Sequence, residues 1–159
     1  MDELIKWLDE NEIDEIFDDV CWLYAIIMTE SSGNPKAESP YARGLMQLSK
    51  IALEDVNKKF GTDFKYDDMF DPLLNVKAGA LYLTLLKNRI RRLGLEPSRF
   101  IVSVAWNWGL GNLLKWMRQK ADNSIIDESL PTETKAHAID VEWYYQNCVR
   151  GRKNGSRLL

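Results

Sequence analysis

The sequence contains no long uninterrupted apolar stretch, and this excludes one broad class of proteins. A helix that crosses a bilayer needs about 20 predominantly apolar residues. Charged residues make up 28% of this 159-residue chain, and they interrupt its apolar segments well before that length. With 45% hydrophobic residues, the chain can still bury a substantial core. We therefore expect one globular domain without a membrane span.

Histidine and cysteine are scarce, with one histidine and two cysteines in the whole chain. Metal sites and catalytic triads need clusters or spacings of such residues that the sequence does not show, and no glycine-rich phosphate loop is present. The sequence therefore predicts no metal and no cofactor. Cys21 lies in an apolar helical pattern, where a free cysteine behaves as a small hydrophobic residue. We expect Cys21 and Cys148 to be two buried thiols rather than a disulfide.

A strongly basic composition, which is typical of nucleic-acid-binding domains, is also lacking, because the formal net charge is only −3. The charge is unevenly distributed: residues 1–20 contain nine acidic residues and one lysine, whereas residues 150–159 contain four basic residues. The acidic N-terminus does not show the basic, then apolar, order of a secretory signal peptide. We expect no nucleic-acid partner. We interpret residues 1–16 as an acidic helix that packs on the domain, and residues 150–159 as a basic tail.

Apolar residues recur at helical spacing almost throughout, and no segment shows a convincing strand alternation. Asp71 and Pro72 are a cap and first-position pair, Gly94 is a stop signal, and Thr132 is a candidate cap. The polar connection at residues 62–70 leaves room for a brief extended piece. The fold class is therefore mainly α, with little or no β structure. Beyond the N-terminal helix, helices are predicted at residues 17–30, 42–60, 71–94, 98–120 with an interruption at Gly109 and Gly111, and 132–149.

Glu30 stands at the end of an apolar helical pattern. Ile26, Ile27 and Met28 precede it, and no basic residue lies within five positions on either side. Apolar surroundings favour the protonated form of a carboxyl, and a protonated carboxyl is the general acid with which glycosidases protonate a leaving sugar oxygen. On this stretch alone, a surface glutamate near a helix end is the simpler interpretation.

Five short motifs follow one another along the chain: ESSGNPKAESP, GLMQLS, NVKAGALYL, SVAWNWG and LPTET. Together they resemble the soluble lytic transglycosylase family, which is related to goose-type lysozymes, over residues 17–145. The resemblance implies a lysozyme-like single domain at residues 17–149. It also implies an enzyme that acts, as a monomer and without a cofactor, on the β-1,4 bond between N-acetylmuramic acid and N-acetylglucosamine in peptidoglycan strands.

The resemblance further implies that Glu30 is the single catalytic residue. It would protonate the glycosidic oxygen and then deprotonate the muramic C6 hydroxyl, so that a 1,6-anhydro ring closes without water. The implied substrate-binding residues are Ser39 near the N-acetyl group, Met46 and Gln47 along the cleft, Trp106 and Asn107 near the cleaved bond, Glu133 supporting the site, and His137.

Three features differ from the usual pattern of that family. The segment SPYARGLMQ is one residue shorter, which alters the placement of Ser39 relative to Glu30. Trp106 replaces a tyrosine, so we expect a hydrogen bond from that position to be lost. His137 also stands where a tyrosine is common. A histidine on a helix face is more often structural than catalytic, although it could titrate near neutral pH and alter activity. Of Trp106 and Trp108, at least one should face the cleft.

Other functions stay open at this point. A goose-type lysozyme would let water attack, with Glu38, Asp67 and Asp68 as candidate acidic helpers. A chitinase would use Glu30 on a polymer without muramic acid. A wall-binding module would keep the sugar contacts but lose the acid, and the retained Glu30 argues against it. Endo or exo cleavage is equally open. Because peptidoglycan lies outside the cytoplasmic membrane, we expect action at the cell wall or in the periplasm after release by a phage, delivery by a machine, or processing of a precursor.

Overall fold

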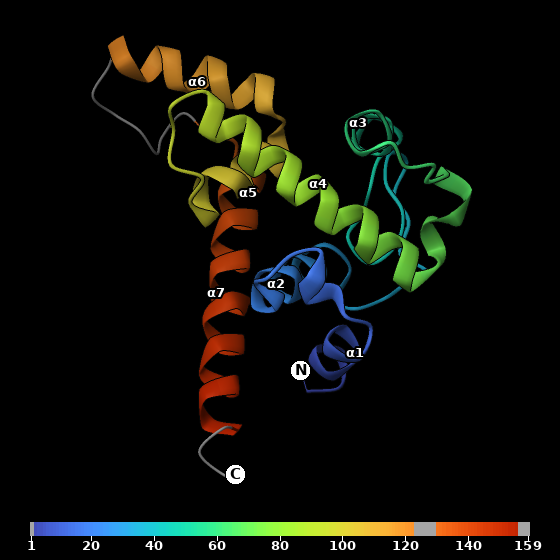
Figure 1. Cartoon of the computed structure of the whole chain (residues 1–159). Helices are drawn as coiled ribbons and strands as arrows, with labels where there is room; N and C mark the ends of the chain where they lie inside the picture. Colours follow the sequence, from blue (N-terminus) through green and yellow to red (C-terminus); the bar gives the residue numbers. More distant parts are fainter. Residues whose placement is uncertain (1, 123–129, 156–159) are drawn as a thin grey trace.

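A computed structural model describes residues 2–122 and 130–155, and in these residues it contains only helices as regular elements (Figure 1). The predicted mainly α fold class is confirmed. None of the described helices combines the length and the apolar character that a membrane span requires. In chain order the elements are α1 (Asp2–Glu10), the 3-10 helix η1 (Ile13–Glu15), α2 (Val20–Ser31), α3 (Lys50–Phe60), the 3-10 helix η2 (Tyr66–Phe70), α4 (Pro72–Arg92), α5 (Arg99–Trp108), α6 (Leu110–Asp122) and α7 (Thr132–Gly155).

Helix α2 lies at the centre of the molecule. Its first eight residues, Val20 to Ile27, are all buried, so the helix has no solvent-facing side over this length. A helix that is apolar all round must be surrounded by other elements. Helix α7 packs along α2, and α1 packs against it with Ile5 and Leu8 (Figure 1). Exposure begins only at the last turn of α2, which contains Glu30.

Local capping signals correctly predicted several helix ends. Asp71 caps α4 by accepting a hydrogen bond from the Leu74 N–H at 2.9 Å, and Pro72 is the first residue of that helix. The helix predicted from residue 98 is present as α5, and Ser98, which was not predicted as a cap, caps it with the Ile101 N–H as donor at 3.2 Å. Helix α7 begins at Thr132 itself, one residue earlier than a cap at that residue would place it.

Other predicted boundaries are wrong. The helix expected from residue 42 begins only at Lys50, because Gly44 and Gln47 have left-handed backbones with φ of 81° and 49°. The connection at residues 62–70 contains η2 rather than an extended piece. Only Gly109 interrupts the α5–α6 pair, whereas Gly111 lies within α6. Helix α7 continues to Gly155, so part of the expected tail at residues 150–159 is helical.

Cys21 of α2 and Cys148 of α7 form a disulfide, with their Cα atoms 5.5 Å apart and a sequence separation of 127 residues. The prediction of two buried thiols is therefore wrong. Both residues are buried as expected. The packing of α7 along α2 brings them together, and that packing is a long-range property of the fold.

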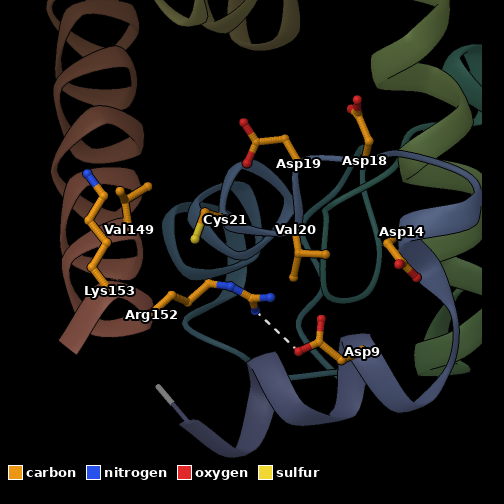
Figure 2. A pocket seen from close by; sticks show the side chains of 9 residues that line it. All are labelled: Asp9, Asp14, Asp18, Asp19, Val20, Cys21, Val149, Arg152 and Lys153. Atoms are coloured by element: carbon orange, nitrogen blue, oxygen red, sulfur yellow. Dashed lines mark hydrogen bonds and ion pairs between the residues drawn. The ribbon is translucent and has the colours of Figure 1, made fainter. Parts of the chain in front are cut away.

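A pocket of about 350 Å³ lies beside this disulfide, at the end of α2 opposite Glu30 (Figure 2). Four aspartates from the N-terminal segment line its wall together with Arg152 and Lys153 of α7. Arg152 forms an ion pair with Asp9 at 3.2 Å. The basic end of α7 is thus held against the acidic N-terminal segment. The domain limits assigned to residues 1–16, 17–149 and 150–159 stay predictions.

A second cluster joins three helices near the same end of the molecule. Arg99 of α5 donates two hydrogen bonds to the Glu142 carboxylate of α7, at 2.8 and 3.1 Å. The guanidinium of Arg99 also lies 3.7 Å from the ring centroid of Tyr145. The Tyr145 hydroxyl donates to Asp19, the cap of α2, at 3.0 Å. The cluster therefore links α5 and α7 to the start of α2.

Replacing both cysteines with alanine should lower the free energy of unfolding by about 2–5 kcal/mol, because the disulfide closes a loop of 127 residues and restricts the unfolded chain. Urea unfolding with and without a thiol reductant measures the effect. The reductant should lower the midpoint of the parent protein and leave that of C21A/C148A unchanged. Equal midpoints for the oxidised and reduced parent would contradict the prediction.

Replacing Glu142 with Gln should lower the melting temperature by about 1–3 °C at pH 7. The hydrogen bonds from Arg99 hold the pKa of Glu142 below its usual value. A depressed pKa contributes stability above the unfolded-state value of about 4.3, and this contribution is lost as pH falls through the lower folded-state pKa. The difference between parent and variant should thus shrink below about pH 4. Glu54→Gln, at an exposed residue of α3, is the control. A difference that did not change with pH would count against the ion pair.

Candidate active site

Glu30 is fixed by the way α2 ends. The hydroxyl of Ser31 donates to the carbonyl of Ile27 at 3.1 Å and to that of Leu45 at 2.7 Å. Ser32 follows with a left-handed backbone, and its N–H donates to the Met28 carbonyl at 3.1 Å. These bonds tie the last turn of α2 to the loop before α3. The Glu30 side chain lies in that turn and is 18% exposed.

Two side chains from distant parts of the sequence meet one carboxylate oxygen of Glu30. Trp106 of α5 donates from Nε1 to Oε1 at 3.0 Å. His137 of α7 places Nε2 at 2.8 Å from the same oxygen. The expectation that Trp106 makes no hydrogen bond is wrong, because the indole N–H is itself a donor that replaces a hydroxyl. Tyr82 of α4 packs against Trp106, with ring centroids 5.1 Å apart. The Glu30 carboxyl therefore lies where α2, α5 and α7 meet, with α4 behind Trp106.

His137 is more deeply buried than its partner, with 7% of its side chain exposed. Its second ring nitrogen, Nδ1, is buried and has no hydrogen-bond partner among the residues that the structure describes. Sequence reasoning named His137 as a site residue but favoured a structural role. The structure places its ring directly against the carboxyl of Glu30.

Asn107 follows Trp106 and is held by a residue that sequence reasoning missed. The buried hydroxyl of Thr134 donates to Asn107 Oδ1 at 2.9 Å, which orients the amide. Thr134 is the last residue of the LPTET motif. The motif therefore included this residue, but a role in the site was predicted only for Glu133. The Glu133 side chain is exposed in the first turn of α7, where a negative charge is favourable for the helix dipole.

Gln47 and Ser39 lie in the loop that joins α2 to α3. Gln47 uses Nε2 to donate to the carbonyls of Ala37 and Gly44, both at 2.9 Å, so this amide group holds the loop. Ser39 is exposed, and its Oγ accepts a hydrogen bond from the Ala42 N–H at 3.1 Å. Ser39 also lines a pocket of about 500 Å³, together with Tyr41, Arg43, Lys50 and Tyr66, among others.

Met46 does not line an open cleft, so its predicted role is corrected. Its side chain has 0% exposure and packs against Gly79 of α4. A methyl group at Gly79 would collide with the Sδ and Cε atoms of Met46. The glycine of the NVKAGALYL motif thus makes room for the methionine of the GLMQLS motif, and the two motifs share a packing contact in the core.

The three acidic residues considered as lysozyme helpers lie near Arg43 or beside its partners. Arg43 forms ion pairs with Glu38 and Asp67, both at 3.2 Å, and its guanidinium lies 4.2 Å from the ring centroid of Tyr66. Asp68 is exposed in η2. Within the described part of the chain, none of these three carboxylates contacts Glu30.

The family model for the transglycosylase SLT domain matches residues 11–128. The chain belongs to this family. Membrane-bound lytic murein transglycosylase C of Pectobacterium atrosepticum is 38% identical over 85% of the chain, and that of Cronobacter sakazakii is 36% identical over 65%. The matches cover 42% and 30% of these relatives, so the SLT domain described here spans less than half of their length.

Solved structures agree on the fold of this SLT domain. An inactive mutant of the lytic transglycosylase Slt from Pseudomonas aeruginosa matches with a TM-score of 0.67 at 23% identity, over 86% of this chain and 22% of that one. The 70 kDa soluble lytic transglycosylase from Escherichia coli gives a TM-score of 0.67 at 25% identity, over 82% and 22%. The predicted lysozyme-like fold of the family is confirmed.

Asn75 of the NVKAGALYL motif stabilises the loop between α2 and α3 of this SLT domain. The fully buried amide accepts a hydrogen bond from the Met46 N–H at 2.9 Å and donates to the carbonyls of Arg43 and Met69 at 2.9 and 3.0 Å. Gly44 lies so close that a side chain there would collide with the Asn75 amide and the Met69 carbonyl. The role of Asn75 was not predicted from the motif.

Asn75→Ala should lower the free energy of unfolding by about 2–3 kcal/mol, because it leaves two buried backbone groups and one partly buried one without their partner. Asn75→Asp, with the same shape, should be worse at neutral pH, since a carboxylate oxygen would then face two carbonyl oxygens. Denaturant unfolding measures both, with the exposed Asn112→Ala expected within about 0.5 kcal/mol of the parent. If Asn75→Ala unfolds like Asn112→Ala, the amide does not hold the loop.

Proposed function

We propose that this SLT domain is a peptidoglycan lytic transglycosylase that cleaves the bond between N-acetylmuramic acid and N-acetylglucosamine. The observation that carries the proposal is the position of Glu30. Its carboxyl is mostly buried, contacted by the indole N–H of Trp106 from α5 and by Nε2 of His137 from α7, and uncontacted by any second carboxylate in the described residues. Such an arrangement suits a reaction with a single acid–base residue. The matches to lytic murein transglycosylases support the same chemistry.

In the proposed reaction, protonated Glu30 transfers its proton to the glycosidic oxygen as the bond from that oxygen to the muramic C1 breaks. The substrate's own N-acetyl group stabilises the positive charge that develops at C1. The Glu30 carboxylate then takes the proton of the muramic C6 hydroxyl, and O6 forms a bond to C1. Glu30 ends in the protonated state in which it began, and the products are a free N-acetylglucosamine end and a 1,6-anhydromuramic end. No water and no cofactor are consumed.

The remaining site residues are assigned to substrate binding. Asn107 is oriented by Thr134, so that its amide can donate to a sugar near the cleaved bond. The amide N–H groups of Gln47 donate to backbone carbonyls of the loop. We therefore assign Gln47 mainly to stabilising the cleft wall, and only its side-chain oxygen to substrate. Ser39 is assigned to the N-acetyl region through the pocket that it lines, and Glu133 to the exposed rim. Trp106 is assigned to contact a sugar with the face of its ring, while its N–H donates to Glu30.

The enzyme is proposed to act as a monomer outside the cytoplasmic membrane, where peptidoglycan lies. The disulfide between Cys21 and Cys148 suits an oxidising compartment. Release by a phage, delivery by a phage or secretion machine, and processing of a precursor are the routes that fit this location. The genes next to the one that encodes this chain would distinguish these routes.

Glu30→Gln should lower the rate of peptidoglycan cleavage by about 100- to 10,000-fold, because the amide can neither give nor take the proton. Circular dichroism should show an unchanged fold, and the exposed Glu54→Gln should cleave like the parent. Turnover by Glu30→Gln at the parent's rate would disprove the assignment.

Mass spectrometry of the muropeptides identifies the reaction, with chitin oligomers digested in parallel. Anhydromuramic ends, lighter by one water than reducing ends, are the expected product of the parent enzyme. Reducing ends would indicate a lysozyme, cleavage of chitin alone a chitinase, and no product at all a wall-binding module.

A further inference from the structure

We propose that His137 acts as a neutral Nε2–H donor which, together with Trp106, fixes Oε1 of Glu30 as the accepting oxygen and leaves the transferable proton on Oε2. This inference builds on the proposed function, because it concerns the oxygen from which Glu30 gives its proton. His137 is a positioning residue in this view. It contacts the catalytic carboxyl and neither gives nor takes the proton of the reaction.

Trp106 contacts Glu30 through its indole N–H. An indole N–H can only donate a hydrogen bond. Oε1 of Glu30 therefore accepts this bond at 3.0 Å whether the carboxyl is protonated or ionised. In a protonated carboxyl the carbonyl oxygen is the better acceptor and the hydroxyl oxygen the better donor. The bond from Trp106 thus favours a carboxyl in which Oε1 is the carbonyl oxygen and Oε2 carries the proton.

The nitrogen of His137 that faces Glu30 is Nε2. Nε2 lies 2.8 Å from Oε1, the oxygen that already accepts from Trp106. When Glu30 is a carboxylate, a bare Nε2 at this distance would set one lone pair against another, so Nε2 must carry a hydrogen. When Glu30 is protonated on Oε2, the same Nε2–H still donates to the carbonyl oxygen Oε1. One tautomer of His137 therefore serves both states that Glu30 adopts during the reaction.

The other ring nitrogen of His137 is Nδ1. Nδ1 is buried, and no described residue accepts a hydrogen bond from it. A histidine cation would carry a hydrogen on Nδ1 as well, and would bury both a charge and an unpaired N–H. In a serine-protease triad an aspartate at Nδ1 makes the histidine a base. No described carboxylate has that place here, so a hydrogen on Nδ1 would have no acceptor among the described residues.

Nuclear magnetic resonance tests the tautomer directly, because His137 is the only histidine of the chain. In protein labelled with ¹⁵N-histidine at neutral pH, we expect a protonated Nε2 and an unprotonated Nδ1, in the parent and in Glu30→Gln alike, since the Gln oxygen still accepts. A signal from the Nδ1–H tautomer, or from a histidine protonated at both nitrogens, would overturn the proposal. This measurement needs no turnover, so it stands even if the parent releases no anhydromuramic products and the proposed function fails.

Two variants separate positioning from proton transfer. His137→Gln can still donate an N–H to Oε1 but cannot titrate, and it should keep kcat within about tenfold of the parent. His137→Leu removes the donor and should lower kcat at least about tenfold below His137→Gln, with KM little changed. Equal and large losses in both variants, with folding intact by circular dichroism, would make His137 itself an acid or base and would also overturn the proposal.

Discussion

The burial of α2 on all its sides is the constraint on which the rest of this structure depends. Eight consecutive buried residues leave no face for solvent, so helices from both ends of the chain must enclose it. Helix α7 makes the most extensive of these contacts, and it places His137 beside the end of α2 that bears Glu30. The position of the carboxyl is therefore set by the core of the protein, and only the last turn of α2 meets the surface.

Features that short stretches of sequence encode were predicted well, and features that depend on distant residues were not. The predicted cap at Asp71 is local, and it is present. The apolar residues of the GLMQLS motif looked helical because Leu45, Met46 and Leu48 are all core residues. Their backbone is instead held in a non-helical loop by Asn75, which comes from another helix and is invisible to a local pattern.

The site shows the same division. Glu30 was identified from its motif and its apolar helix, and the motifs also pointed to Trp106, Asn107 and His137. The contacts among them were not predicted, because they join α2, α5 and α7 across 76 and 107 residues of sequence. The disulfide was missed for this reason too, since each cysteine was considered in its own helix. Thr134 was overlooked because its hydroxyl acquires a role only when α7 packs on α5.

Two replacements relative to the usual family pattern act on the same atom. Trp106 and His137 both stand where tyrosines are common, and both reach Oε1 of Glu30. A tyrosine hydroxyl can donate or accept, whereas an indole N–H and an Nε2–H only donate. The pair therefore gives the carboxyl a one-sided environment in which its two oxygens are chemically distinct before any substrate arrives.

The disulfide also changes the topology of the polypeptide. Because it joins residues 21 and 148, the chain between them is a covalent ring that includes α3 to α6 and the loop around Gln47. A protease that cuts one peptide bond in this ring opens it without releasing a fragment, since the two pieces stay joined through sulfur. The disulfide joins α2, which bears Glu30, to α7, which bears His137, so these two helices stay linked after such a cut. A protein with this connectivity can lose the continuity of its backbone and still keep both halves of its candidate active site on one molecule.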